Sequence, residues 1–302
     1  MTQTTKPAIG LTLSHHIVAG VVNNNKLASA LQSYPPEGED YEDALIEMPR
    51  EGIISVMCDE IRALIKGGAK PSAVGVALPG IVRNGVVEDS PNLPQLKGAR
   101  VEEELCAALK EAGISTTVKA MNDADAVAAG LAASHGKLET TIRVWTVGTG
   151  IGFGRYPIVD GIWEGGHTVV TLDDKETYCG CGGRGHLEGI MGHRAMRLRF
   201  LDMEPEDIFE NAKKGDPRCM EFRKLWHKAL AAATASSIHI SGAGKFYLTG
   251  FNIRFLDQNL LRDYIEQMVR MSPLQNFTFE IVPEAVENEV LGAAVIAQQA
   301  IT

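Results

Sequence analysis

Four side chains able to bind a soft metal ion fall close together in the middle of the sequence. His167, Cys179, Cys181 and His186 lie within twenty residues of one another. Two thiolates and two neutral imidazoles are donors that tetrahedral Zn²⁺ favours, and four protein ligands leave no open position for water. The spacing therefore predicts a structural zinc site. The alternative is a glycine-rich surface loop whose side chains never converge, because C-x-C is a less diagnostic spacing than a repeated C-x2-C.

A run of alternate glycines joins two apolar segments just before this cluster. Gly148, Gly150 and Gly152 carry no side chain, so backbone N–H groups there can approach an anionic oxygen and the chain can adopt positive φ. The run lacks the lysine of a P-loop and does not open a helix as a dinucleotide motif does. Pattern alone leaves a phosphate-binding loop and a simple tight hairpin equally open.

Acidic residues at three further positions could do acid–base or hydrogen-bonding chemistry. Asp123 follows an expected strand and precedes an expected helix, where an acid is most often an N-cap worth about 1 kcal/mol. A carboxylate at a strand end can instead accept a proton from a substrate hydroxyl beside a phosphoryl donor. Position alone favours the cap. Glu164 and Glu188 flank the metal ligands, and carboxylates held there are natural acceptors for sugar hydroxyls.

The first part of the chain must position Asp123. Apolar residues with glycine and asparagine punctuation predict three strands in meander order at residues 8–14, 17–22 and 27–34. A helix is expected over 41–66, interrupted near Pro49, because an interior proline removes a backbone donor. A buried strand at 74–78, a turn-rich stretch to Gly98, a helix at 101–111 and a strand at 116–120 follow.

The second part must position the glycine run and the metal ligands. A helix is expected at 124–134, followed by strands at 143–147 and 151–156 and a loop dense in Gly, Cys and His. A mostly helical tract over 187–241 precedes a strand at 246–249, a helix at 256–271, a strand at 277–282 and a closing helix at 287–300. This order predicts two α/β lobes facing across a cleft, and such clefts are where small-molecule sites usually lie.

Composition excludes several classes of protein. The chain has 302 residues, 45% of them hydrophobic and 22% charged, which is typical of a globular protein. Lys and Arg number 29 against 38 Asp and Glu, and a net charge of −9 repels a nucleic-acid backbone. Apolar stretches fall short of the roughly 20 residues a membrane span needs. An odd count of five cysteines and an N-terminus with no apolar core predict a cytoplasmic protein without disulfides.

Taken together, the motifs resemble the ROK family (repressor, open reading frame, kinase) of sugar kinases and sugar-responsive regulators. The segments that carry the resemblance occur in family order and span most of the chain. They are Ala77-Leu78-Pro79-Gly80 with Ser90-Pro91-Asn92-Leu93, Asn122-Asp123-Ala124-Asp125-Ala126, Gly148-Thr149-Gly150-Ile151-Gly152, Glu164-Gly165-Gly166-His167, and Cys179-Gly180-Cys181-Gly182-Gly183-Arg184-Gly185-His186-Leu187-Glu188.

The resemblance implies an actin-like (ribonuclease H-like) ATPase or hexokinase-type fold, with two lobes around a sugar-binding cleft. The small lobe would comprise residues 1–120 and the returning helix 287–302, and the large lobe residues 121–286. The implied reaction is phosphoryl transfer from a nucleotide to a hexose hydroxyl. Implied cofactors are structural zinc, and Mg²⁺ with ATP if the protein is catalytic. No nucleic acid or membrane partner is expected, and a homodimer or tetramer is.

Residue roles follow from the same resemblance. Asp123 would be the catalytic base. The sugar would contact Asn92, Asn122, Glu164, His167 and Glu188. The nucleotide would contact Gly148, Thr149, Gly150, Gly152 and Gly250. His167 would serve both sugar and metal.

Three positions depart from the family pattern. The third cysteine of the metal loop is His186, which can still bind zinc. Family kinases carry Asp-x-Gly-Gly-Thr on the opening strand, whereas this chain reads Thr12-Leu13-Ser14-His15-His16. The acid that helps organise Mg²⁺ is thus missing, and the side chains of Ser14 and His15 crowd the phosphate approach. The imidazoles of His15 and His16 could contact phosphate in place of the missing glycine loop, and this is the weaker alternative. Where the family carries Gly-Gly on the adenosine side of the second lobe, this chain reads Gly250-Phe251.

Two functions are consistent with this pattern. The first is a hexose kinase, favoured by the intact pair Asn122-Asp123. The second is a non-catalytic sugar-binding regulator or sensor with an eroded ATP site, since family repressors tend to lose the opening phosphate loop. Such repressors add an N-terminal helix-turn-helix, whereas only about seven residues precede the first expected strand here. The kinase is therefore the preferred interpretation.

Overall fold

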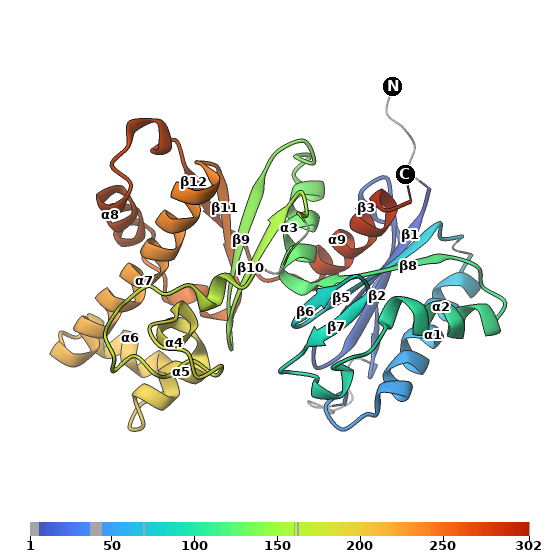
Figure 1. The fold of residues 1–302 in the computed structure, drawn as a ribbon, viewed down its shortest axis with the longest axis horizontal. Helices are drawn as coiled ribbons and strands as arrows, with labels where there is room; N and C mark the ends of the chain where they lie inside the picture. The colour runs from blue at the N-terminus through green and yellow to red at the C-terminus, as the bar shows by residue number, and fades with distance from the viewer. Residues whose placement is uncertain (1–5, 37–43, 69, 160, 162, 302) are drawn as a thin grey trace. The chain divides into compact units, whose positions relative to one another are not determined.

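The computed structural model describes residues 6–36, 44–68, 70–159, 161 and 163–301 (Figure 1). The chain is divided into two compact units. The first comprises Met1–Thr141, Gly154–Ile162 and Ala285–Thr302, and the second comprises Ile142–Phe153 and Trp163–Glu284. The boundary expected after residue 120 falls ahead of a helix that packs within the first unit, at Asp123–Ser134.

The first unit is built on a six-stranded sheet in the order β3-β2-β1-β5-β8, with β4 also on β2. Its strands are β1 (Ala8–Leu13), β2 (Ile17–Asn23), β3 (Lys26–Leu27), β4 (Gln32–Tyr34), β5 (Ala73–Leu78) and β8 (Thr117–Asn122). The meander is confirmed, although its third strand is two short segments that both pair with β2. Strands β1, β5 and β8 run parallel, so their carboxyl ends lie at one edge.

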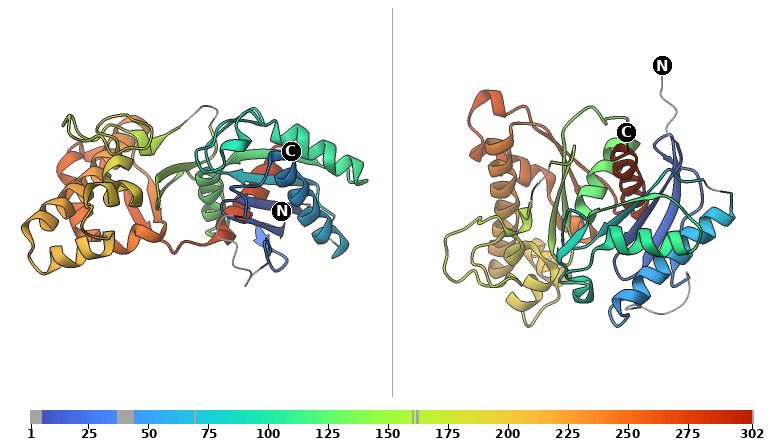
Figure 2. Two further views of the ribbon diagram at one scale, coloured as in Figure 1. Left: turned by 90° about the horizontal axis from the view of Figure 1, so that it is seen from below. Right: turned by 45° about the vertical axis from the view of Figure 1, so that its right-hand side comes forward.

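Helices cover both faces of this sheet, as Figure 2 shows. The helices are α1 (Arg50–Lys66) and α2 (Val101–Glu111) on one face, and α3 (Asp123–Ser134) and α9 (Val286–Gln299) on the other. Side chains alternate along β1: Ile9, Leu11 and Leu13 pack with α1 and α2. Gly10 faces α9, where a Cβ would lie 1.8 Å from the carbonyl oxygen of Val290. Only glycine at position 10 allows α9 to lie so close to β1.

Two details of the first unit differ from the predictions. Helix α1 begins after Pro49, and residues 44–49 are not helical, while residues 41–43 lie outside the described part. The turn-rich stretch contains an unpredicted hairpin of β6 (Ile81–Arg83) and β7 (Val86–Asp89). Asn84 and Gly85 between them have φ of 51° and 74°. Two consecutive positive φ angles match the strand twist, and Asn-Gly is the usual sequence for this turn.

The second unit is built on a four-stranded sheet in the order β10-β9-β11-β12. Its strands are β9 (Ile142–Val147), β10 (Ile151–Tyr156), β11 (Lys245–Thr249) and β12 (Thr278–Ile281), with the end of β10 grouped in the first unit. The helical tract resolves into α4 (Leu187–Met191), α5 (His193–Arg199), α6 (Pro205–Lys213) and α7 (Pro217–Ser241), followed later by α8 (Gln258–Met268). Trp145, Trp226 and Phe246 are fully buried in its core.

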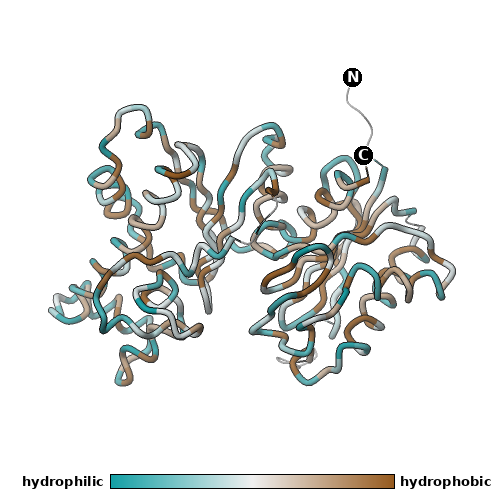
Figure 3. Tube along the Cα trace, in the orientation of Figure 1, coloured by the Kyte–Doolittle hydropathy of each residue, from teal (hydrophilic) through white to brown (hydrophobic). Residues whose placement is uncertain are grey.

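Apolar residues follow the central strands, seen as brown segments in Figure 3. Strands β1 and β5 are buried along their whole length. Within the described residues, no helix combines the length and the hydropathy that crossing a bilayer requires.

Candidate functional site

The four predicted metal ligands converge in the second unit. One ligand atom from each of His167, Cys179, Cys181 and His186 lies within 4.8 Å of all the others. The two Sγ atoms are 3.4 Å apart, and Cys181 Sγ is 3.2 Å from His186 Nδ1. Donors around tetrahedral zinc are separated by about 3.3–3.8 Å, and the two distances lie within or just below this range, which is compatible with a zinc site. The alternative of a loop whose side chains stay apart is wrong.

Backbone contacts fix the loop that carries these ligands. Val170 N donates to Gly185 O at 2.8 Å, and Leu187 N donates to Thr168 O at 3.0 Å. A Cβ at Gly183 would lie 2.1 Å from the His186 ring, so a larger residue would displace that imidazole. Glycine is therefore needed beside the ligand.

Burial sets the ionisation of the ligands in the absence of an ion. It raises the pKa of the Cys179 thiol to about 12, so a cation is needed to hold the thiolate there. Burial, and then the neighbouring His167, lower the pKa of His186. The neutral imidazole that metal binding requires is thus the favoured form.

Glu188 links the metal loop to the glycine run. Its Oε2 accepts from Ile151 N at 3.0 Å, and Cys179 Sγ lies 3.7 Å from its Oε1. A Cβ at Gly150 would lie 2.5 Å from the same carboxylate. Glu164 is exposed, just before the 3-10 helix Gly165–His167, and its carbonyl accepts from His167 N at 3.0 Å.

The glycine run forms the connection between β9 and β10. Gly148, Gly150 and Gly152 do not adopt positive φ, so a need for positive φ is not the reason for glycine at these positions. Close approach explains two of them instead: Gly150 lies against Glu188 and Gly148 against Phe251, whose ring would be 3.2 Å from a Cβ. Thr149 between them is exposed.

The adenosine-side segment reaches the same connection. Gly250 has φ of 100°, and a Cβ there would lie 2.5 Å from Val147 O. The fully buried Asn252 donates to Gly148 O at 3.0 Å, and its Oδ1 is 3.3 Å from His193 Nδ1. These residues hold the start of the run in place, while the ring of Phe251 covers it.

In the first unit, Asn122 and Asp123 lie at the carboxyl end of β8. Asn122 is the N-cap of α3, its Oδ1 accepting from Ala124 N at 2.9 Å and from Asp125 N at 3.3 Å. Its Nδ2 donates to Gly80 O at 2.9 Å. The expectation that Asp123 serves as the cap is therefore wrong. Asp123 is half-buried at the first helical position, where its Oδ1 accepts from Ala124 N at 2.8 Å.

The remaining predicted sugar contact, Asn92, is exposed in the first unit, just before the 3-10 helix Pro94–Leu96. The turn between β1 and β2, which departs from the family pattern, contains Ser14 and His15, both exposed. Ser14 N donates to His16 O at 2.9 Å across this turn. Their side chains occupy the positions where family kinases carry glycines.

A cavity of about 830 Å³ in the second unit opens beside the glycine run. Its lining joins the run to α5, through Thr149, His193 and Arg194. The volume is within the range of roughly 300–1,000 Å³ typical of small-molecule sites.

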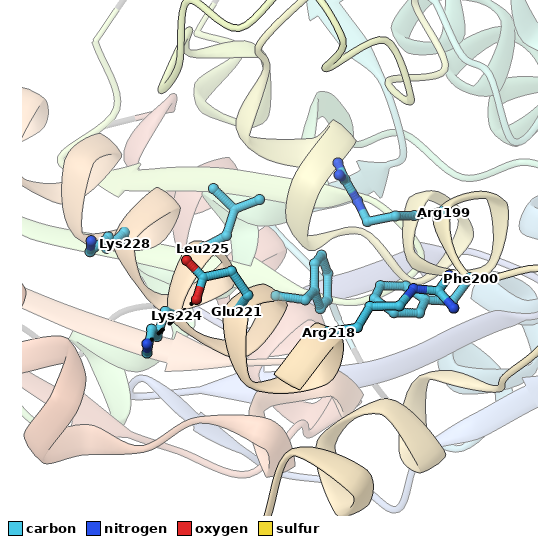
Figure 4. A pocket seen from close by; sticks show the side chains of 8 residues that line it. Arg199, Phe200, Arg218, Glu221, Lys224, Leu225 and Lys228 are labelled. Carbon is cyan, nitrogen blue, oxygen red and sulfur yellow. Dashed lines mark hydrogen bonds and ion pairs between the residues drawn. The ribbon is translucent and has the colours of Figure 1, made fainter. Parts of the chain in front are cut away.

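A smaller cavity of about 440 Å³ lies along α7 (Figure 4). Four cationic side chains line it together with aromatic, aliphatic and acidic ones. The lining residues are Arg199, Phe200, Arg218, Glu221, Phe222, Lys224, Leu225 and Lys228. Arg218 pairs with Asp202 at 3.0 Å and Lys224 with Glu221 at 3.5 Å, so much of the positive charge is neutralised locally. None of the predicted site residues lines this cavity.

Comparisons with known proteins agree with the family resemblance that these motifs indicate. The model of the ROK family matches residues 14–300. The chain belongs to the ROK family. A glucokinase from Pyrobaculum calidifontis is 32% identical over 181 residues, which cover 54% of this chain and 57% of that glucokinase. The match thus spans little more than half the length of the glucokinase. An N-acetylmannosamine kinase from Haemophilus influenzae is 26% identical over 230 residues, covering 72% and 74% of the two chains.

Solved ROK structures show the fold. The ROK hexokinase from Thermus thermophilus has a TM-score of 0.76 with 24% identity, covering 98% of this chain and 99% of that one. The predicted α/β class and actin-like ATPase fold are thereby confirmed.

Several polar residues around the glycine run and at the end of β1 were not found by sequence reasoning. Asn252 and His193 hold the glycine run through hydrogen bonds to Gly148 O. Thr12 donates a hydrogen bond to the carboxylate of Glu289 on α9. The one available signal was a polar residue, Thr12, in an otherwise apolar strand.

Proposed function

We propose that this protein is a sugar kinase, in which Asp123 is the general base for phosphoryl transfer from a nucleotide to a hexose hydroxyl. The observation that carries the proposal is the capping of α3 by Asn122. Because the neighbouring amide makes the cap, Asp123 is not itself the N-cap residue, although its Oδ1 also accepts from Ala124 N. A half-buried carboxylate at the carboxyl end of a parallel strand is suited to accept a proton from a bound substrate.

The chemistry assigned to Asp123 is a single proton transfer. As the sugar hydroxyl oxygen forms its bond to the terminal phosphorus, its proton passes to the Asp123 carboxylate. The bond from that phosphorus to the bridging oxygen breaks, and the nucleoside diphosphate leaves with the electron pair. Mg²⁺ bound with the nucleotide would neutralise phosphate charge.

The other predicted residues would hold the reactants. Glu164, His167 and Glu188 would accept or donate hydrogen bonds to sugar hydroxyls, together with Asn92 and Asn122. The nucleotide phosphates would lie along Gly148, Thr149, Gly150 and Gly152, with Gly250 on the adenosine side. Zinc bound by His167, Cys179, Cys181 and His186 would fix the loop that presents Glu188. The cytoplasmic location and the assembly as a homodimer or tetramer stay predictions.

A coupled assay with a panel of hexoses and either ATP or polyphosphate tests the proposal on zinc-loaded protein. Asp123→Asn is expected to lower kcat by about 10³-fold, within the range for loss of a general base, while sugar affinity changes little. Asp125→Asn is the matched control, because Asp125 Oδ1 accepts from Arg155 N at 2.9 Å and an amide oxygen can keep that bond. Full activity of Asp123→Asn would contradict the assigned mechanism.

One observation favours a second function, a sugar-binding regulator or sensor that has lost phosphoryl transfer. The ring of Phe251 covers Gly148, at the start of the run expected to bind phosphates. Calorimetry separates the two functions. A regulator would bind sugar with an affinity that nucleotide never alters and would show no turnover with any pair of substrates.

A further inference from the structure

The side chain of Thr12 contacts a carboxylate from the far end of the sequence. Thr12 is 1% exposed, and it lies on the face of β1 that α9 covers, since its neighbours Leu11 and Leu13 point to the opposite face. Its hydroxyl donates a hydrogen bond to Glu289, across a separation of 277 residues. Residue 12 thus has a carboxylate beside it, although it is not itself an acid.

Close packing of α9 brings Glu289 to this position. A Cβ at Gly10 would lie 1.8 Å from Val290 O, and a Cβ at Gly75 would lie 1.9 Å from Ala293 O. Two strands thus present bare backbone to the helix, which can lie directly on the sheet (Figure 1). Glu289 is in the first turn of α9, where the helix dipole favours an ionised carboxylate.

Strand register places this carboxylate at the same sheet edge as Asp123. Thr12 pairs with Ala77 of β5, and Ala77 pairs with Met121 of β8. Two strand spacings separate β1 from β8, about 10 Å. Ligands of open α/β sheets bind beyond the carboxyl ends of parallel strands, and both acids lie there.

We propose that Glu289 supplies from α9 the carboxylate that family kinases carry on the opening strand, and that it acts on the divalent cation accompanying the nucleotide. The inference rests on the proposed kinase function. Carboxylate oxygens are hard donors suited to Mg²⁺, whereas the Thr12 hydroxyl carries no charge. The acid has moved from strand to helix, and Thr12 holds it in position.

The test measures how much a divalent cation strengthens nucleotide binding. Calorimetry on the full chain gives the Kd of metal-free AMP-PNP and of Mn·AMP-PNP, and their ratio isolates the contribution of the metal. Glu289→Gln is expected to lower this ratio at least about tenfold, as loss of a metal-directed carboxylate does. Glu287→Gln, an exposed acid in the same first turn, should leave it unchanged.

Two further variants separate a metal role from a structural one. Thr12→Val removes the hydrogen bond but keeps the charge, so the ratio should stay within about threefold of wild type. Thr12→Asp combined with Glu289→Gln returns the acid to β1 and should restore the ratio. A Glu289→Gln protein with the wild-type ratio, an equal loss in Thr12→Val, or no recovery in the double variant overturns the inference.

Failure of the kinase proposal shows itself separately. If wild type phosphorylates a hexose but Mn²⁺ does not change AMP-PNP affinity, the assignment of Glu289 alone is wrong. If wild type neither turns over nor binds AMP-PNP with or without Mn²⁺, both proposals are wrong.

Discussion

The metal loop and the carboxyl edge of the first sheet achieve convergence by different means. In the loop, four ligands within twenty residues come within 4.8 Å of one another, held by short-range backbone bonds and glycines. At the sheet edge, Thr12 meets Glu289 across 277 residues, through the seating of a helix on two strands. One site is local in sequence, and the other depends on the packing of a whole unit.

This difference decides how each region should respond to change. The local cluster is expected to depend on an ion, because burial raises the pKa of the Cys179 thiol to about 12 without one. The sheet edge needs no ion to form, because it is stabilised by close backbone packing and by a buried apolar core. The loop should therefore be sensitive to metal, and the edge to the volume of single residues.

The largest effect is expected from Cys181→Ser. Cys181 is exposed, so replacing sulfur by oxygen should cost little except through the ion. Loss of several kcal/mol of metal-linked folding energy should lower Tm by about 10 °C, with zinc falling from one equivalent to near zero. Elemental analysis and thermal unfolding measure both quantities.

Cys106→Ser is the matched control for this change. Cys106 is half-buried and its Sγ lies 3.6 Å from Thr116 O, so it lies outside the metal cluster. It should retain zinc and nearly all of the wild-type Tm. If Cys181→Ser keeps the wild-type Tm and neither protein contains zinc, the loop is not a zinc site.

Gly10→Ala should produce the next largest effect, in the other region. The new methyl would lie 1.8 Å from a backbone oxygen of α9, which cannot move away as a side chain can. The free energy of unfolding should fall by about 3 kcal/mol, the upper part of the range for overpacking. Urea unfolding measures the loss, and zinc content should not change.

Gly20→Ala provides a control at the paired position of β2. Its methyl would lie 2.7 Å from the Leu31 Cδ2 atom, the end of a flexible side chain that can turn aside. We expect a loss of about 1 kcal/mol or less. Equal losses in the two variants would show that α9 does not sit as closely on β1 as described.

Sequence reasoning succeeded where the physical cause is local. Helix α2 was predicted at its observed bounds, and the four metal ligands were predicted to converge. It failed where the cause is distant. The contact of Thr12 with Glu289 cannot be predicted from spacing in the sequence, because only the tertiary packing of α9 brings the two residues together.

Phe251→Gly tests whether the eroded nucleotide side limits ligand binding. The ring covers Gly148 and meets the His193 ring at 5.3 Å between centroids. Its removal should expose the start of the glycine run and raise AMP-PNP affinity about tenfold, measured by calorimetry; one ordered aromatic contact is worth about this much.

Phe251→Leu, which keeps most of the bulk, should bind the analogue like wild type. Weaker binding in Phe251→Gly than in wild type would contradict this prediction. The ring would then be a surface on which the base stacks.

The smallest effect is expected from His227, which lies in α7 and is not one of the four metal ligands. Its Nδ1 is 2.7 Å from Arg223 O, and its Nε2 accepts from Asp257 N at 2.9 Å, so the neutral ring is used on both sides. Burial, above all, lowers the pKa of His227. Its contribution to stability is therefore complete above the unfolded-state pKa of about 6.5 and is lost as pH falls below that value. Below this pH the unfolded chain binds a proton at the His227 imidazole, whereas the folded chain keeps the imidazole neutral to lower pH.

Urea unfolding of wild type and His227→Gln between pH 7 and pH 5 measures this loss. One proton gives at most about 1.4 kcal/mol per pH unit, and the variant should show a shallower slope. In zinc-loaded protein the metal loop should add a second contribution of the same sign, because zinc binding requires a neutral imidazole at His186 and deprotonated thiols and therefore weakens as pH falls. Repeating the pair in the zinc-free Cys181→Ser background separates them: the difference between the two proteins should persist while both slopes become shallower. If His227→Gln does not flatten the slope in either background, burial of this imidazole does not control the acid response of the second unit.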